Sequence, residues 1–268
     1  MSAAPRPLPR AFFERDVLTV ARELLGQLLV RRAGPALLVA RIVEVEAYGG
    51  LDCDPSAHSF RGPTPRCAVM FGPAGHAYVY STHQGRCCLN VSAVGDARGQ
   101  AVLLRAADPL RGQEAMAVAR LAGLAQGPTR TRLLAGGAPH ELLSGPARLC
   151  AALGVDRALN GADLCDASGP LWLARGAAVA HTAWTARVGL NPKSASFGWR
   201  WRAIAAGSRA VSAPRGQADA TPQPEPRRAV SAPRGPADAT PQPEPRRAGA
   251  RPGLRDAKPR RPGARRGL

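Results

Sequence analysis

Lysine is scarce in this sequence: only Lys193 and Lys258 occur among 268 residues. Enzymes that attack a substrate through a Schiff base need an amine nucleophile, and lysine is the side chain that supplies it. No lysine precedes Lys193, which follows all of the motifs described below. Covalent catalysis through an amine is therefore not expected.

Long apolar runs are also missing. No apolar stretch of about 18 residues or more is present, which is the length that a membrane-spanning helix needs. Residues 1–10 are basic and rich in proline, and the apolar segment of a secretory signal does not follow them. We therefore expect a soluble, cytoplasmic protein with no membrane partner and a flexible N-terminus over residues 1–10.

The six cysteines include no Cys-x-x-Cys pair. Cysteines at that spacing are typical of zinc sites and redox motifs. The chain is also long enough to build a core without disulfides. We expect reduced, mostly buried thiols, no metal site and no cofactor.

Basic residues outnumber acidic ones, with 37 Lys and Arg against 19 Asp and Glu and a net charge of +18. The excess is spread along the chain: residues 1–210 carry 24 basic and 14 acidic side chains, and residues 211–268 carry 13 and 5. A polyanion such as nucleic acid is the partner that this charge favours. A coding bias towards arginine would also produce the excess, so charge alone leaves both explanations open.

The end of the sequence contains a tandem repeat with a period of 19 residues: 211–229 recurs as 230–248 with Gln217 replaced by Pro236. Residues 211–268 contain 12 prolines, no aromatic residue and almost no large aliphatic residue. Such a segment cannot bury enough apolar surface to offset the entropy lost on ordering. We predict one folded domain over residues 11–210 and a disordered tail over 211–268, which either adds salt-sensitive DNA affinity or is an inert solvated segment.

The pattern of residues 11–210 predicts an α+β fold, a curved and largely antiparallel sheet with flanking helices. The segment 36–48 alternates, which places Ile42, Glu44, Glu46 and Tyr48 on one face of a strand. Residues 49–75 are rich in Gly, Pro, Asp and Ser and predict a long ordered loop, a kind of loop that is usually functional. Further strands are predicted at 27–31, 77–80, 87–92, 101–106 and within 171–206, and helices at 11–25, 109–124 and 146–153.

Glu46 is the leading candidate for a catalytic base. Hydrolysis of a glycosidic bond needs a carboxylate that deprotonates water and stabilises positive charge on the sugar. Acids on one face of a strand more often form a solvated surface, so Glu46 alone decides little. The other candidate residues strengthen the assignment. Tyr48, His58, Tyr80 and Arg105 supply the aromatic faces and hydrogen-bonding groups that hold a flipped base.

A series of short motifs resembles the alkyladenine (3-methyladenine) DNA glycosylase family in order and spacing over roughly residues 11–210. They are Arg41–Tyr48 (RIVEVEAY), Ala57-His58-Ser59, Thr64-Pro65-Arg66, Met70-Phe71, Tyr78-Val79-Tyr80, Cys88-Leu89-Asn90, Val102–Ala106 (VLLRA), Ser144-Gly145-Pro146 and Ala186–Gly189 (ARVG). The resemblance implies a base-excision-repair enzyme that flips alkylated or deaminated purines out of double-stranded DNA and hydrolyses the N-glycosidic bond.

The resemblance also implies roles for individual residues. Glu46 would activate the attacking water and Arg105 would help to hold it, and Glu44→Gln would have a much milder effect than Glu46→Gln. The flipped purine would be held between Tyr48 on one side and His58 and Tyr80 on the other. The remaining implied contacts are Asn90 against the 2-amino group of guanine, Arg148 and Arg157 on DNA phosphates, and Met70 in the groove; for these outer positions a plain surface or core role stays open.

Two positions depart from the family pattern. The hairpin tip, where the family has Tyr-Gly-Met and inserts the tyrosine into DNA, reads His83-Gln84-Gly85 here. Cys67 stands where asparagine commonly follows Thr-Pro-Arg. The first departure predicts less efficient flipping, because a smaller ring fills the vacated space less well.

These observations predict a monomeric, monofunctional DNA glycosylase, nucleoid-associated in a bacterial cytoplasm. The scarcity of lysine argues against strand cleavage by the same enzyme. The alternative is a lesion-binding protein of the same fold that turns over poorly because its wedge is altered. Glu46 argues against this alternative, since binding alone would not require the acid.

Overall fold

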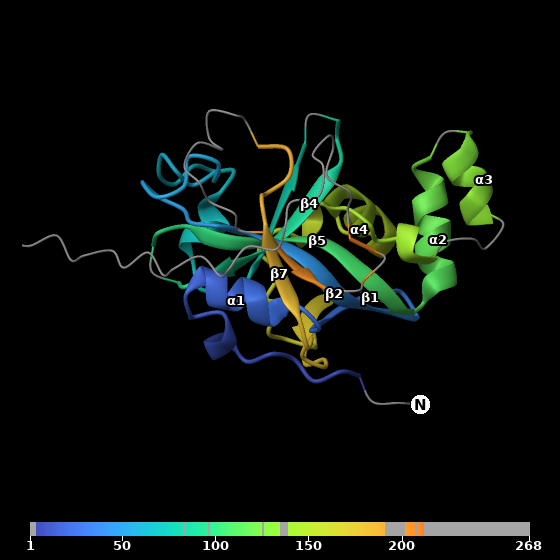
Figure 1. The fold of residues 1–268 in the computed structure, drawn as a ribbon, viewed down its shortest axis with the longest axis horizontal. Coiled ribbons are helices and arrows are strands. Elements are labelled where there is room, and N and C mark those ends of the chain that lie inside the picture. Colours follow the sequence, from blue (N-terminus) through green and yellow to red (C-terminus); the bar gives the residue numbers. More distant parts are fainter. Residues whose placement is uncertain are drawn as a thin grey trace, which may run out of the picture. The chain divides into compact units, whose positions relative to one another are not determined.

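Strands dominate the computed structural model, which describes residues 4–82, 84–95, 97–124, 126–134, 139–190, 202–206, 208 and 210–211. Within these residues the strands form one curved, antiparallel sheet with helices packed against it (Figure 1). The strand order is β3-β4-β5-β2-β1-β6, and β8 pairs with both β2 and β7. The predicted α+β class is confirmed.

The elements have the following bounds. The strands are β1 Leu28–Ala33, β2 Ala36–Tyr48, β3 Ala77–Ser81, β4 Cys87–Ala93, β5 Gln100–Arg111, β6 Leu171–Ala174, β7 Thr182–Thr185 and β8 Arg202–Ala205. The α-helices are α1 Val17–Leu24, α2 Gln113–Ala122, α3 Pro128–Leu134 and α4 Pro146–Leu153. Short 3-10 turns are η1 Arg10–Phe12, η2 Ala68–Phe71, η3 Pro139–Glu141 and η4 Arg157–Leu159.

The N-terminal helix begins later than the predicted range 11–25. Asp16 is its N-cap and accepts hydrogen bonds from the backbone N–H groups of Leu18 and Thr19. These bonds satisfy two donors that the first turn would otherwise leave unpaired. The preceding residues form the turn η1, and Phe13 is fully buried. The apolar spacing therefore identified the buried face, whereas the cap set the start of the helix.

The predicted helix 109–124 was also placed too early. Strand β5 continues through Pro109 to Arg111, and Pro109 pairs with Ala40 of β2. Gly112 then turns the chain with a φ of +81°, and a Cβ there would clash with the side chain of Leu38. Helix α2 begins only after this glycine. Helix α3 was not predicted at all, whereas α4 has the predicted bounds, with Pro146 at its start.

Strand β2 lies at the centre of the sheet, between β5 and β1. Its pairing with β5 shifts between Ile42 and Glu44 and again between Glu44 and Val45. As a result Ile42 joins Val45 and Ala47 in the main core, instead of sharing a face with Glu44, Glu46 and Tyr48 as the simple alternation predicted. An extra residue in a strand reverses which side the following residues face.

The main core lies between the sheet and the helices, with α1 against β2 and α4 against β4 and β5. No helix in the described part of the chain is long and apolar enough to span a membrane. His83, residues 191–201 of the region 171–206 in which strands were predicted, and residues 212–268 of the predicted tail lie outside the described residues.

Candidate active site

Glu46 is fully buried near the end of β2 and is held by three donors. Its Oε1 accepts the backbone N–H of Val188 at 2.7 Å. Its Oε2 accepts the hydroxyl of Tyr48 at 3.1 Å and a guanidinium N–H of Arg105 at 3.2 Å. The sheet thus holds a carboxylate in a fixed orientation, with donors on both of its oxygens.

Arg105 reaches both acids of β2. Its Nε donates to Glu44 Oε1 at 2.7 Å while its Nη1 donates to Glu46. The second register shift explains this position, because Glu44 pairs with Ala106 and Val45 with Leu104, which leaves Arg105 as the extra residue of β5. A bulge of this kind re-aims a side chain, and such bulges are frequent next to active sites.

The charges of this cluster are matched. Burial alone would lower the pKa of Arg105, but the carboxylates of Glu46 and Glu44 outweigh it and raise that pKa above its usual range. Glu44 is itself fully buried and also accepts from Arg202 Nε at 2.7 Å. Glu44 is therefore an internal ion-pair partner of two arginines rather than a solvated surface acid.

A second buried pair supports Tyr48. Arg187 makes a bidentate ion pair with Asp54, with N–O distances of 2.6 and 2.9 Å, and donates to the backbone oxygen of Ala47 at 3.0 Å. Its guanidinium lies 4.6 Å from the centre of the Tyr48 ring. Burial, and then the charge of Glu46, raise the pKa of Tyr48 well above its usual value. The phenol therefore stays protonated and donates to Glu46.

A small pocket opens beside Glu46. Its volume is about 50 Å³, and it is lined by Tyr48, Ser56, His58, Met70, Tyr78, Tyr80 and Asn90. Five of the residues predicted from the sequence thus line one pocket: Tyr48, His58, Met70, Tyr80 and Asn90. Glu46, Arg105, Arg148 and Arg157 do not line it. A space of this size holds a few water molecules, so a purine base requires the pocket to widen.

Aromatic rings form the outer wall of this pocket. The rings of His58 and Tyr80 meet edge to face with centroids 4.5 Å apart. His58 Nδ1 lies 2.8 Å from the Tyr78 hydroxyl, and Arg66 lies over the Tyr80 ring at 5.2 Å. Although His58 belongs to the exposed residues, the partial burial of its ring and then the charge of Arg66 lower its pKa to about 4. Burial raises the pKa of Tyr78 to about 12, so the wall is uncharged near neutral pH apart from Arg66.

Asn90 and Met70 complete the lining. Asn90 is 4% exposed, and its side-chain amide donates to the backbone oxygen of Tyr78 at 3.0 Å. That bond fixes the amide against the neighbouring strand. Met70 is also 4% exposed and packs with Cys67 and Tyr78. A groove contact by Met70 would therefore require the pocket to open.

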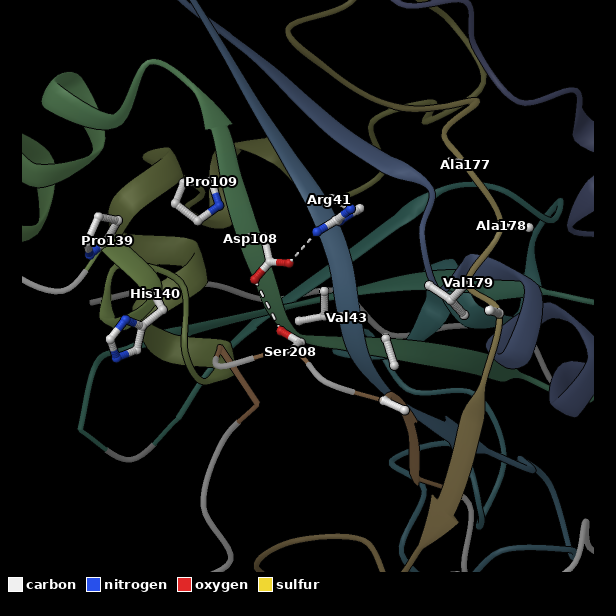
Figure 2. Close-up of a pocket in the computed structure, with 13 residues that line it drawn as sticks. Arg41, Val43, Asp108, Pro109, Pro139, His140, Ala177, Ala178, Val179 and Ser208 are labelled. Atoms are coloured by element: carbon white, nitrogen blue, oxygen red, sulfur yellow. Dashed lines mark hydrogen bonds and ion pairs between the residues drawn. The ribbon is translucent and has the colours of Figure 1, made fainter.

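A larger hollow lies elsewhere and contains none of the predicted site residues. This hollow has a volume of about 720 Å³. Arg41 pairs there with Asp108 at 2.9 Å, and the Ser208 hydroxyl donates to the same carboxylate at 3.1 Å (Figure 2). Its main polar groups thus satisfy one another. In the described part of the chain, no three His, Cys, Asp or Glu side chains are arranged to hold a metal ion.

A profile of the methylpurine-DNA glycosylase (MPG) family matches residues 11–209. The chain belongs to this family. It is therefore a DNA glycosylase that acts on alkylated bases, and its substrate is DNA.

Related proteins carry the same kind of name. A protein of Koribacter versatilis named "Putative 3-methyladenine DNA glycosylase" is 44% identical over 211 residues, which cover 78% of this chain and 94% of the relative. Proteins of the same name from Streptomyces avermitilis and Methanocella arvoryzae are 46% and 42% identical, covering 67% and 69% of this chain and 79% and 84% of the relatives.

The two arginines predicted to contact DNA phosphates lie outside the lining of the base pocket. Arg157 is exposed in the turn η4, which contacts β3, and its charge acts on Tyr78. Arg148 is exposed on α4. His83 lies outside the described residues, so its insertion into DNA stays a prediction, as do the phosphate contacts of the two arginines.

Sequence reasoning assigned no role to Arg187, Asp54 or Tyr78. Arg187 and Tyr78 stand inside motifs that carried the family resemblance, but neither motif shows which buried partner each residue meets. Asp54 lies within the loop 49–75, where an acid is unremarkable. The one available signal was the position of Arg187 in an otherwise apolar Ala-Arg-Val-Gly segment.

Proposed function

We propose that this glycosylase is monofunctional and releases alkylated or deaminated purines by hydrolysis with a water activated by Glu46. The observation that carries the proposal is the setting of Glu46, a fully buried carboxylate oriented by Val188, Tyr48 and Arg105 beside an aromatic pocket. These three donors fix the direction of the carboxylate beside the pocket, which is the placement that a general base needs.

The reaction needs one proton transfer to Glu46. As the bond from C1′ to the purine nitrogen lengthens, its electron pair leaves with the base and positive charge develops on the sugar. The carboxylate of Glu46 stabilises this charge and removes a proton from water, whose oxygen bonds to C1′. An alkylated purine leaves readily because it is already cationic or otherwise electron-poor. Arg105 is then a positioning residue, since its contacts run to the two glutamates.

The aromatic wall accounts for recognition. Tyr48 on one side and His58 and Tyr80 on the other offer ring faces and edges that a flipped base can stack upon. Because the pocket holds only about 50 Å³ in this structure, we expect these rings to separate when a base enters. Asn90 is held in place by its hydrogen bond to the backbone oxygen of Tyr78. It would exclude bases that carry an additional group at the edge facing it.

Substitution of Glu46 by glutamine tests the chemistry. Loss of a general base lowers a rate by about 10²–10⁴, so we expect Glu46→Gln to abolish measurable single-turnover release of hypoxanthine or 3-methyladenine. Binding to lesion-containing duplex should stay near that of the wild type, because glutamine keeps the shape. Glu114→Gln, at an exposed acid of α2, is the matched control and should retain full activity. Release by Glu46→Gln at the wild-type rate would exclude its catalytic role.

The same assay separates two further possibilities. A wild-type protein that binds the lesion duplex but releases no base would be a lesion-binding protein, the alternative that the sequence left open. A product strand cut at the abasic site without added base or heat would show lyase activity. In that case the amine would be sought at Lys193 and then at the N-terminus.

A further inference from the structure

The ring of Tyr48 lies between the base pocket and a buried cation. Tyr48 lines the pocket together with His58 and Tyr80. The guanidinium carbon of Arg187 lies over the same ring, 4.6 Å from its centre, and Arg187 does not belong to the pocket lining. Arg187 is therefore behind the ring, on the side away from the place proposed for the flipped base.

Asp54 binds this cation in a fixed geometry. The carboxylate forms the bidentate ion pair with Arg187, and both side chains are 1% exposed. The carboxylate also accepts the backbone N–H groups of Gly49 at 3.1 Å and Ser56 at 3.0 Å. The loop after β2 thus supplies the anion and the segment after β7 supplies the cation, and together they form the rear wall behind Tyr48.

The charge of Arg187 is permanent. A guanidinium does not lose its proton in proteins; burial would lower the pKa of Arg187, but the hydrogen bonds and the charge of Asp54 raise it above its usual range. Acids and arginines are equal in number among the buried side chains around Glu46 and Tyr48 in the described part of the chain: Glu44, Glu46, Asp54, Arg105, Arg187 and Arg202. This balance holds only while Asp54 carries its charge.

The charge behind the ring matters because the candidate substrates differ in charge. An alkylated purine such as 7-methylguanine is a cation, whereas hypoxanthine is neutral. The face of an aromatic ring attracts a cation, but an uncompensated cation on the opposite face repels it. A base stacked about 3.5 Å from the ring lies roughly 8 Å from the guanidinium. Two unit charges at that separation and an effective dielectric of about 20 weaken binding about thirtyfold.

We propose that the Asp54–Arg187 pair determines how the pocket discriminates between cationic and neutral bases. Asp54 neutralises Arg187 behind Tyr48, which allows a positively charged alkylpurine to stack on the face of the ring that is turned to the pocket. The inference rests on the proposed function, because it requires that the flipped base stacks on Tyr48. It assigns a specificity-determining role to two residues that do not touch the base.

Binding to two lesions tests this role. Full-length protein is titrated with duplexes that carry either 7-methylguanine or hypoxanthine on a sugar that resists hydrolysis. The titration is done at about pH 6, where His58 is still neutral because its pKa is about 4. The measured quantity is the selectivity ratio, the Kd for hypoxanthine divided by the Kd for 7-methylguanine. General changes in DNA affinity or folding alter both Kd values and cancel in this ratio.

The two residues of the pair should shift the selectivity ratio in opposite directions. Asp54→Asn keeps the shape of the side chain but leaves the cation uncompensated, so we expect the ratio to fall about tenfold or more. Arg187→Met leaves a carboxylate behind the ring, so the ratio should rise. The double variant has neither charge and should return to within about twofold of the wild-type ratio.

Asp166→Asn is the matched control, because it makes the same change of charge at an exposed acid in the turn before β6. Its selectivity ratio should equal that of the wild type. Removal of one member of a buried ion pair destabilises a protein, so circular dichroism at low temperature checks that each variant is folded. If Asp54→Asn does not fold, the direction of the change in Arg187→Met still decides.

The outcomes separate this proposal from the catalytic one. Unchanged ratios in the single variants, shifts in the same direction, or an equal shift in Asp166→Asn would overturn the role of the pair. The titrated duplexes cannot react, so these results do not depend on base release. If the ratios shift as expected while Glu46→Gln releases base at the wild-type rate, the catalytic proposal fails and this one stands. An inactive Glu46→Gln together with unchanged ratios gives the reverse.

Discussion

Glu44 offers a sharp test of the structure, because sequence and structure lead to different expectations for it. From the sequence, Glu44→Gln is a mild control for Glu46→Gln. In the structure Glu44 is fully buried and its Oε1 accepts from both Arg105 and Arg202 at 2.7 Å. Glutamine keeps one acceptor oxygen but removes the charge, and the buried cluster of two acids and two arginines is left with a net positive charge.

The expected loss is large. Removing one partner of a buried ion pair costs about 3–5 kcal/mol, and because glutamine retains an oxygen we expect the lower end, about 3 kcal/mol. In a domain of this size each kcal/mol lowers Tm by about 2–4 °C, so the shift is roughly 6–12 °C. Base release should fall less than in Glu46→Gln, because Arg105 keeps its bond to Glu46.

Thermal unfolding followed by circular dichroism measures this effect, with Glu114→Gln as the control. A second variant, Glu44→Gln with Arg202→Gln, restores the charge balance. In a double-mutant cycle we expect the two changes to cost less together than their sum, by about 0.5–3 kcal/mol. A Tm for Glu44→Gln within about 2 °C of the wild type, which corresponds to less than about 1 kcal/mol, would refute the buried ion-pair reading.

Three further predictions concern other parts of the chain. As the pH falls from 6.5 to 4, the wild type should lose stability relative to His58→Asn. The reason is that His58 binds a proton near pH 6.5 in the unfolded chain but only at a pKa of about 4 in the folded protein. Parallel pH profiles of Tm for the two proteins would contradict this. Truncation after Ser212 should keep base release and flatten the salt dependence of DNA binding; an unfolded fragment would place the tail within the domain. His83→Tyr should speed single-turnover release from paired duplex more than from single strands, because only the duplex must be unstacked; equal effects would make His83 an ordinary hairpin residue.

Most residues of the candidate site could be predicted from the sequence, because they stand in local motifs. The alternation in 36–48 predicted β2, the Gly145-Pro146 pair predicted the start of α4, and the family motifs named Tyr48, His58 and Tyr80, which line one pocket. The recognition and the α+β class are confirmed by the family match and by the fold. The catalytic roles themselves stay predictions.

Long-range pairing decided the rest. Pro109 has a poor propensity for strands, yet its pairing with Ala40 extends β5 to Arg111, since cross-strand contacts outweigh local preference. The register shifts that turn Arg105 towards Glu44 and Glu46 depend on how two strands 60 residues apart align. The sequence of either strand alone does not indicate this alignment.

The charges show the same division most clearly. Composition determined that this protein is strongly basic and suits a polyanion. Only the tertiary structure decided which arginines are committed to internal carboxylates, as Arg187 is to Asp54, and which donor atoms are buried without a hydrogen-bond partner, as Arg120 Nε is. The physical reason is that a buried charge is defined by its neighbours in space, and folding brings those neighbours from distant parts of the sequence.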